Sequence, residues 1–171
     1  MVNSFSRSLT VNTVSYDDAM KLLKDIESTP RYTFSFRLAA SGVTAFVYAM
    51  LFKAAFQEAL VAAVISMVIY SIKEKISEIG FFLFFEYFMS GLIAGSMSLI
   101  AVKLFPAMNM YKIIIGSIMV LVPGVALTNG IKDALYGDTV SSIYRLAEAA
   151  FIAIGVASGV GIALSIGLRW V

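Results

Sequence analysis

The sequence predicts an all-α, polytopic membrane protein with five transmembrane helices. The chain has 171 residues, of which 60% are hydrophobic and only 14% are charged. A soluble domain averages about 45–50% apolar and about 25% charged residues. This chain therefore has too little polar surface to enclose a water-soluble core, and its high hydrophobicity excludes intrinsic disorder. One span takes about 20 residues, so five spans need about 100, close to the number of apolar residues present.

Two residue types are missing, and their absence excludes several kinds of chemistry. The chain has no Cys and no His, which excludes disulfides, Cys or His metal sites and nucleophiles that depend on a histidine base. We therefore expect no metal, no cofactor, no catalytic residue and no enzyme. A membrane-embedded enzyme would need paired carboxylates at matching depth, and the sequence shows none. The net charge of +2 does not indicate binding to nucleic acid.

Residues 1–30 are predicted to form a cytoplasmic amphipathic segment, followed by a five-helix transmembrane domain over residues 31–171. Ser15 and Asp18 have the spacing of a helix N-cap, apolar residues then recur at helical intervals, and Pro30 ends the segment. This helix either lies on the bilayer or docks as the edge of a soluble domain. Its acidic residues favour docking.

The transmembrane helices are placed from the uncharged runs in the sequence. Three of these runs are clear, whereas the first two helices reach full length only if their flanking polar residues lie at the interface. The alternating pattern of a membrane barrel strand is absent from the sequence. The predicted helices cover residues 33–52, 55–73, 80–102, 111–131 and 141–168.

The distribution of Lys and Arg predicts the orientation in the membrane. With a cytoplasmic N-terminus and five spans, most of the 13 basic residues fall inside, and only Lys53, Lys103, Lys112 and Arg169 fall outside. We therefore expect a multi-pass protein of the cell (cytoplasmic) membrane with its N-terminus in the cytoplasm and its C-terminus outside. Trp170 would anchor the outer end of the last helix.

The fourth predicted helix is broken at Pro123-Gly124. Pro123 has no N–H to donate, so the Met119 carbonyl is expected to lose its helical hydrogen bond, and Gly124 makes a break easier. By helix rise the break lies about 15 Å from Ile113, near the bilayer midplane. Transporters use such breaks to bind ions and anionic groups. The alternative is a structural kink supported by neighbouring helices.

Polar residues after the break favour a functional lining. Thr128 and Asn129 add side-chain donors and acceptors about one turn later, on the cytoplasmic side. The predicted substrate-binding residues are therefore Pro123, Gly124, Thr128 and Asn129.

Charged residues follow, and we expect them to surround the cytoplasmic entrance of the site. They are Lys132, Asp133, Arg145 and Glu148. Arg145 and Glu148 are three residues apart and share a helical face. They form either a gate with a carboxylate-binding arginine or an exposed interfacial ion pair, and we favour the ion pair for Arg145. Asp138, or else Thr139, is predicted to cap the fifth helix.

Glu86 is the one acidic residue clearly inside a predicted span. An ionisable group at such a position suggests function by default, and Glu86 could carry a proton. The alternative is that its side chain extends to the inner interface, about 9 Å away by helix rise from Gly80. Arg37 and Glu58 have the same ambiguity, and extension to the interface is favoured for Glu58.

Two small-residue motifs, Gly91-x-x-x-Gly95 and Gly155-x-x-x-Gly159, predict close helix packing. The motifs do not say whether the contact lies within the chain or between chains. Five spans are also few for a complete alternating-access transporter, because such folds combine two repeats around a central site. The second repeat would come from a partner or a second copy.

The fourth and fifth helices resemble the signature of the threonine/serine exporter family. The matching stretches are Leu121-Val-Pro-Gly-Val-Ala-Leu-Thr-Asn-Gly-Ile-Lys-Asp133, then Gly137-Asp138, then Arg145-Leu-Ala-Glu-Ala149. Val2-Asn3 and the amphipathic helix resemble the linker before the first span of that family. Lys132 stands where Arg is commoner in the family, which keeps the charge but loses a bidentate fork, and Ser142 stands where Gly is commoner.

The resemblance implies a half-subunit of a secondary active exporter of small amino acids (threonine/serine) or of dicarboxylates such as succinate. It implies an antiporter in an oligomeric complex that works by alternating access, with a second five-span membrane subunit as partner. Family members usually carry a longer cytoplasmic region before the linker. The alternative is a non-transporting structural or assembly subunit, which a continuous fourth helix and no cavity at Pro123 would favour.

Overall fold

A computed structural model of the chain describes residues 16–27, 32–80 and 82–167. Within these residues every regular element is a helix and no strand occurs. The chain divides into two compact units, Met1–Phe34 and Ser35–Val171. The all-helical class predicted from the sequence is therefore confirmed for the part that the structure describes.

The first unit contains the predicted amphipathic helix, α2 (Tyr16–Glu27). Its apolar Met20, Leu22 and Leu23 are all exposed. Several residues used in the sequence interpretation lie outside the described residues: Val2, Asn3, Ser15, Pro30, Arg169 and Trp170.

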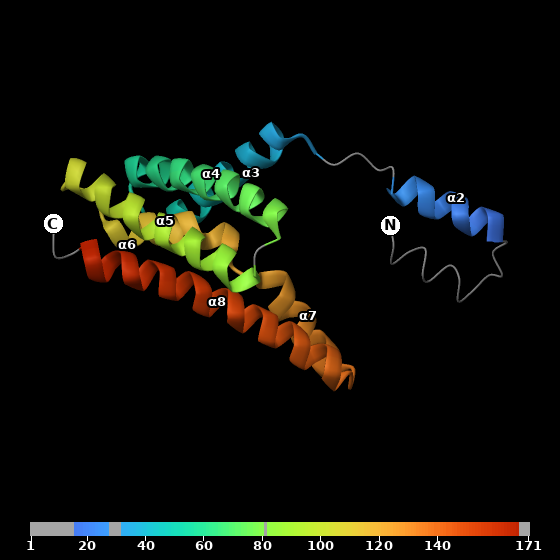
Figure 1. Cartoon of the computed structure of the whole chain (residues 1–171). Coiled ribbons are helices and arrows are strands. Elements are labelled where there is room, and N and C mark those ends of the chain that lie inside the picture. The colour runs from blue at the N-terminus through green and yellow to red at the C-terminus, as the bar shows by residue number, and fades with distance from the viewer. Residues whose placement is uncertain (1–15, 28–31, 81, 168–171) are drawn as a thin grey trace. The chain divides into compact units, whose positions relative to one another are not determined.

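The remaining elements follow the five predicted helices closely (Figure 1). They are α3 (Phe34–Leu51), α4 (Phe56–Ile79), α5 (Leu83–Leu104), α6 (Met110–Ile118), the 3-10 helix η1 (Met119–Leu121), α7 (Gly124–Leu135) and α8 (Thr139–Gly167). The predicted fourth helix corresponds to α6, η1 and α7 together. The predicted second helix ends too early, at residue 73. In the structure the charged residues that follow continue α4, and Gly80, with a φ of 77°, ends it.

Within the described ranges, three helices are long and apolar enough to cross a membrane: α3, α5 and α8. The bent pair formed by Met110–Leu121 and Gly124–Leu135 adds a fourth if it counts as one span. All five predicted helices are thus present, whereas five membrane spans remain a prediction.

Glycines join α5 to α8, which run side by side (Figure 1). An added Cβ at Gly91 of α5 would collide with the Val156 carbonyl oxygen of α8, and one at Gly159 of α8 would collide with the Phe88 carbonyl oxygen of α5. The two small-residue motifs therefore face each other within one chain. Such close backbone approach is how membrane helices gain contact without a hydrophobic driving force.

Small residues also bring α3, α4 and α6 together. Gly116 of α6 lies against Ala49 of α3 and Ala62 of α4, and Gly42 of α3 lies against Met67 of α4. The buried core between these helices, α5 and α8 consists of Ala49, Ala54, Ala59, Ala62, Ile65, Ile69, Ala94, Ile113, Leu121 and Val156. The second half of the broken helix, α7, packs along the first turns of α8, where Gly130 meets Leu146.

Replacing Gly159 with Ala is expected to destabilise the protein, because the new methyl group would collide with the backbone of α5 at Phe88. Overpacking of this kind costs about 1–3 kcal/mol. Gly161→Ala, about half a turn further along α8, is the matched control, since nothing lies within 4 Å of its added Cβ. The free energy of unfolding in detergent micelles distinguishes the two variants. Equal stabilities would contradict the α5–α8 contact.

Candidate functional site

The predicted break in the fourth helix is present. The helix axis bends by 58° between Met110–Leu121 and Gly124–Leu135. The backbone passes through one 3-10 turn and is extended at Val122, with φ −61° and ψ 126°. The missing N–H of Pro123 accounts for the position of the break.

The hydrogen bonds at the break differ from the prediction at one atom. The Met119 carbonyl, expected to lose its donor, accepts from the Val122 N–H at 3.3 Å, while the Gly124 N–H donates to the Val122 carbonyl at 2.8 Å. Pro123 has no N–H, and the Gly124 N–H is taken by Val122, so the Val120 carbonyl has no helical donor three or four residues further on. The 3-10 turn thus moves the loss of pairing from Met119 to Val120.

Thr128 and Asn129 lie on α7, one turn after the break. The Thr128 hydroxyl donates to the Gly124 carbonyl at 2.8 Å, which pairs a carbonyl in the first turn of α7 and leaves the hydroxyl oxygen able to accept. Thr128 is exposed and Asn129 is half-buried. Both side chains are therefore within one helical turn of the irregular backbone.

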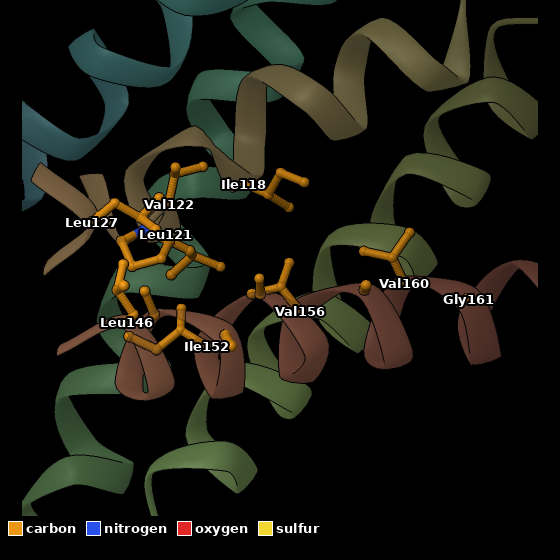
Figure 2. A pocket seen from close by; sticks show the side chains of 14 residues that line it. Ile118, Leu121, Val122, Leu127, Leu146, Ile152, Val156, Val160 and Gly161 are labelled. Carbon is orange, nitrogen blue, oxygen red and sulfur yellow. The ribbon is translucent and has the colours of Figure 1, made fainter. Parts of the chain in front are cut away.

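An apolar groove of about 630 Å³ opens beside the break, between α6–α7 and α8 (Figure 2). Ile118, Val122 and Leu127 contribute to one wall, and Leu146, Ile152 and Val156 of α8 to the other. Pro123 lines this groove, whereas Gly124, Thr128 and Asn129 do not. The structure thus places the four predicted substrate-binding residues at the break but does not bring them together in this groove.

The charged residues near the predicted entrance form a pair that sequence spacing did not indicate. Arg145 Nε donates to Asp133 Oδ2 at 2.8 Å and joins α8 to α7. The two side chains are 44% and 27% exposed, so the pair contributes at most about 1 kcal/mol. Glu148 is half-buried, and Lys132 is exposed with its Nζ 5.9 Å from the centre of the Tyr136 ring.

Asp138 caps α8, which confirms the first of the two predicted capping residues. Its Oδ1 accepts the Ser141 N–H at 3.1 Å, and Gly137 makes the preceding turn with a φ of 81°. Hydrogen bonds from the Ser141 side chain and backbone, helped by the charge of Arg145, lower the pKa of the Asp138 carboxyl below its ordinary value. The cap therefore favours the ionised form of Asp138.

Glu86 is buried in the first turn of α5, with 7% of its surface exposed. Neighbouring helices rather than solvent enclose this side chain, and it lies near the end of the helix rather than at its middle. No group of three or more acidic side chains able to hold a metal ion occurs among the described residues.

A set of polar contacts at the end of α4 was not predicted. Arg37 of α3 donates to Glu74 Oε1 at 2.6 Å and to the Tyr70 hydroxyl at 3.1 Å. Lys73 donates to the Tyr87 hydroxyl of α5 at 2.9 Å and lies 4.1 Å from the centre of its ring. The available signal was the spacing of Tyr70, Lys73 and Glu74, which recur three and four residues apart on one side of α4. These contacts tie α3 and α5 to α4.

Glu58 acts as a cap for two helices. It lies in the first turn of α4 and is buried, with 5% of its surface exposed. Its Oε2 accepts the Ala55 N–H at 2.7 Å at the start of α4, and its Oε1 accepts the Asn109 N–H at 2.6 Å at the start of α6. A carboxylate at a helix start also interacts favourably with the helix dipole.

The Asp138 cap is expected to weaken at low pH. Because the pKa of Asp138 is lowered in the folded protein, its stabilising effect is complete above the ordinary Asp pKa of about 3.9 and is lost as pH falls through the lowered value. Hydrogen exchange of the Ser141 amide should accelerate over that range relative to Asp138→Asn, whose amide caps without titrating. Identical pH profiles for the two proteins would contradict the cap.

Known proteins support the family resemblance. The threonine/serine exporter family matches residues 1–167. A Mycobacterium tuberculosis protein named "Probable threonine/serine exporter" is 28% identical over 160 residues, which cover 91% of this chain and 30% of that protein. The chain therefore spans less than a third of the length of this relative, and no solved structure matches it. With a family match over nearly its whole length and several helices apolar enough to cross a bilayer, this multi-pass membrane protein belongs to the threonine/serine exporter family.

Proposed function

We propose that the chain is one part of a secondary active exporter of small amino acids such as threonine and serine, or of dicarboxylates. It crosses the membrane five times and works by alternating access with a second five-span subunit. The observation that carries this proposal is the helix broken at Pro123-Gly124. The family match supports export as the activity, and the greater length of the matched relative supports a second part.

The fifth span in this proposal is α4. Its 24 residues give a length of about 36 Å, enough to cross about 30 Å of hydrocarbon. It packs against both α5 and α6, and its Ile65, Ser66 and Ile69 are almost fully buried. A helix enclosed by other helices needs less apolar surface than one that faces lipid. Five spans would put the two termini on opposite sides of the membrane, and the distribution of Lys and Arg favours the N-terminus in the cytoplasm and the C-terminus outside.

The groups at the break match the two ends of an amino acid. The Val120 carbonyl has no helical donor at Pro123 or Gly124 and can bind an ammonium group. The first-turn amides of α7 and the Asn129 side chain can bind a carboxylate. Carbonyl oxygens attract ammonium and repel carboxylate, so the break by itself suits an amino acid better than a dicarboxylate.

The broken helix supports transport over a purely structural role. Unpaired carbonyls are unfavourable in hydrocarbon, so a helix that only held a partner in place would be more stable if it were continuous. Here the helix bends by 58° and the groove reaches Pro123. Both features are the opposite of those expected for an assembly subunit.

Arg145, Asp133, Lys132 and Glu148 form the cytoplasmic entrance in this proposal. Arg145 contacts Asp133 through its Nε atom, and this pair joins α8 to α7. Other guanidinium donors of Arg145 can therefore approach a substrate carboxylate, which competes with Asp133 for the same charge. An exposed pair of low stability is suited to opening and closing.

Thr128→Ala combined with Asn129→Ala is expected to impair export of threonine. Loss of one hydrogen bond to a charged group costs about 1.5–3 kcal/mol, so the rate should fall by about tenfold or more. Radiolabelled threonine export is measured from host cells in which the variant replaces the original chain, so that any partner is present. Thr44→Ala is the matched control, because Thr44 makes the same hydroxyl-to-carbonyl bond, to Ala40 at 2.8 Å, on α3. Unchanged export by the double variant would refute the site.

Glu86→Gln is expected to remove the response of export to an imposed pH gradient, because the amide cannot carry a proton. Glu86→Asp keeps a titrating carboxyl and should retain the response. Both variants are measured in membrane vesicles from the same host, with and without a pH difference. If export by the Gln variant still responds to the pH gradient, Glu86 is excluded as the proton carrier. The proposed substrate site is not affected by that result.

A further inference from the structure

One long face of α8 has no partner among the residues that the structure describes. On its other side, Gly155 and Gly159 contact the backbone of α5. A second row of small residues runs along the open face, and all four are exposed: Ala150, Ala153, Ala157 and Gly161. At Gly161 an added Cβ would meet nothing within 4 Å. The helix therefore carries two small-residue rows, one occupied and one open.

The open row lines the apolar groove beside the break (Figure 2). Across from it stand Ile118 and Val122, which belong to the broken helix. The groove thus combines a floor of small residues with a wall of larger ones. This shape admits the backbone of another helix at close range, as α5 shows on the opposite side of α8.

The irregular backbone next to the groove must be buried or hydrated if it lies in the membrane. Val122, at the irregular segment, is 48% exposed, and the Val120 carbonyl has no helical donor at Pro123 or Gly124. Non-helical backbone within hydrocarbon occurs only where protein buries it or water surrounds it. Every residue that lines this groove is apolar, and apolar cavities stay dry. We therefore expect a protein segment, rather than water, to bury the irregular backbone.

We propose that the groove holds a transmembrane helix of the second subunit, packed on Ala150, Ala153, Ala157 and Gly161 at backbone contact. This inference rests on the proposed two-part exporter. The matched relative, of which this chain spans 30%, has chain enough to supply such a helix. A second copy of this chain fits less well, because a two-fold contact sets groove against groove and two concave surfaces leave each other unfilled.

The docked helix would complete the substrate site. Backbone contact with the small-residue row brings polar groups of the second subunit to the break, where they can pair with the substrate or with the carbonyl of Val120. The site at Pro123 then lies between two subunits rather than within one, which accounts for the position of Gly124, Thr128 and Asn129 outside the groove.

Photo-crosslinking of the full chain in its host membrane tests the proposal. Benzoylphenylalanine replaces Leu127, a large side chain that lines the groove and is 40% exposed. The matched control carries the same probe at Val43 of α3, which is 62% exposed and lies outside the groove. A product is expected at Leu127 and not at Val43. Peptide mass spectrometry of this product should identify a second membrane chain with several apolar segments and its own Pro-Gly break.

A second pair of variants tests the small-residue row itself. With the probe at Leu127, Ala157→Trp fills the groove and should abolish the product, whereas Ala157→Ser keeps the surface and should retain it. Adducts at Leu127 to lipid or to a second copy only, or no adduct, would overturn the proposal. Capture of the second subunit at Val43 alone would overturn this docking face but keep the two-part exporter. Threonine transport by the purified chain alone in lipid vesicles would overturn both.

Discussion

The backbone contact between α5 and α8 is the interaction on which the rest of the structure depends. Gly91 and Gly159 leave room for the carbonyls of Val156 and Phe88, and this places the longest helix of the chain against the core. α8 then supplies one wall of the groove, holds α7 through Gly130 and Leu146, and presents Arg145 to Asp133. Any larger residue at these glycines would displace α8 and everything attached to it.

Local chemistry made most of the fold predictable. The break follows from the missing N–H of Pro123, the cap of α8 from a turn glycine before Asp138, and the helix boundaries from runs of apolar residues. Each of these effects acts between residues a few positions apart. The same local reasoning placed the unpaired carbonyl at Met119, and failed there because a 3-10 turn gives that group a new donor.

Contacts between residues far apart in the chain could not be predicted from the sequence. Arg145 pairs with Asp133 on the preceding helix rather than with Glu148, Arg37 pairs with Glu74 of α4, and Glu58 bonds to the N–H of Asn109. These partners are set by how helices pack, which one sequence does not state. The apolar nature of the groove was missed for the same reason, because it depends on which face of α8 is turned towards the break.

Because Glu58 caps both α4 and α6, it fixes the first half of the broken helix, α6, and leaves the second half, α7, better able to move. The start of α6 is tied to the start of α4 through Glu58 and Asn109, and Lys112 Nζ adds a bond of 2.6 Å to the Lys53 carbonyl. By contrast α7, beyond the break, is packed on α8, to which a single exposed ion pair joins it. A hinge at Pro123 would therefore move α7 along α8, while α6 and α8 stay with the core. Access to the site would then change from the side of the break on which α7 lies.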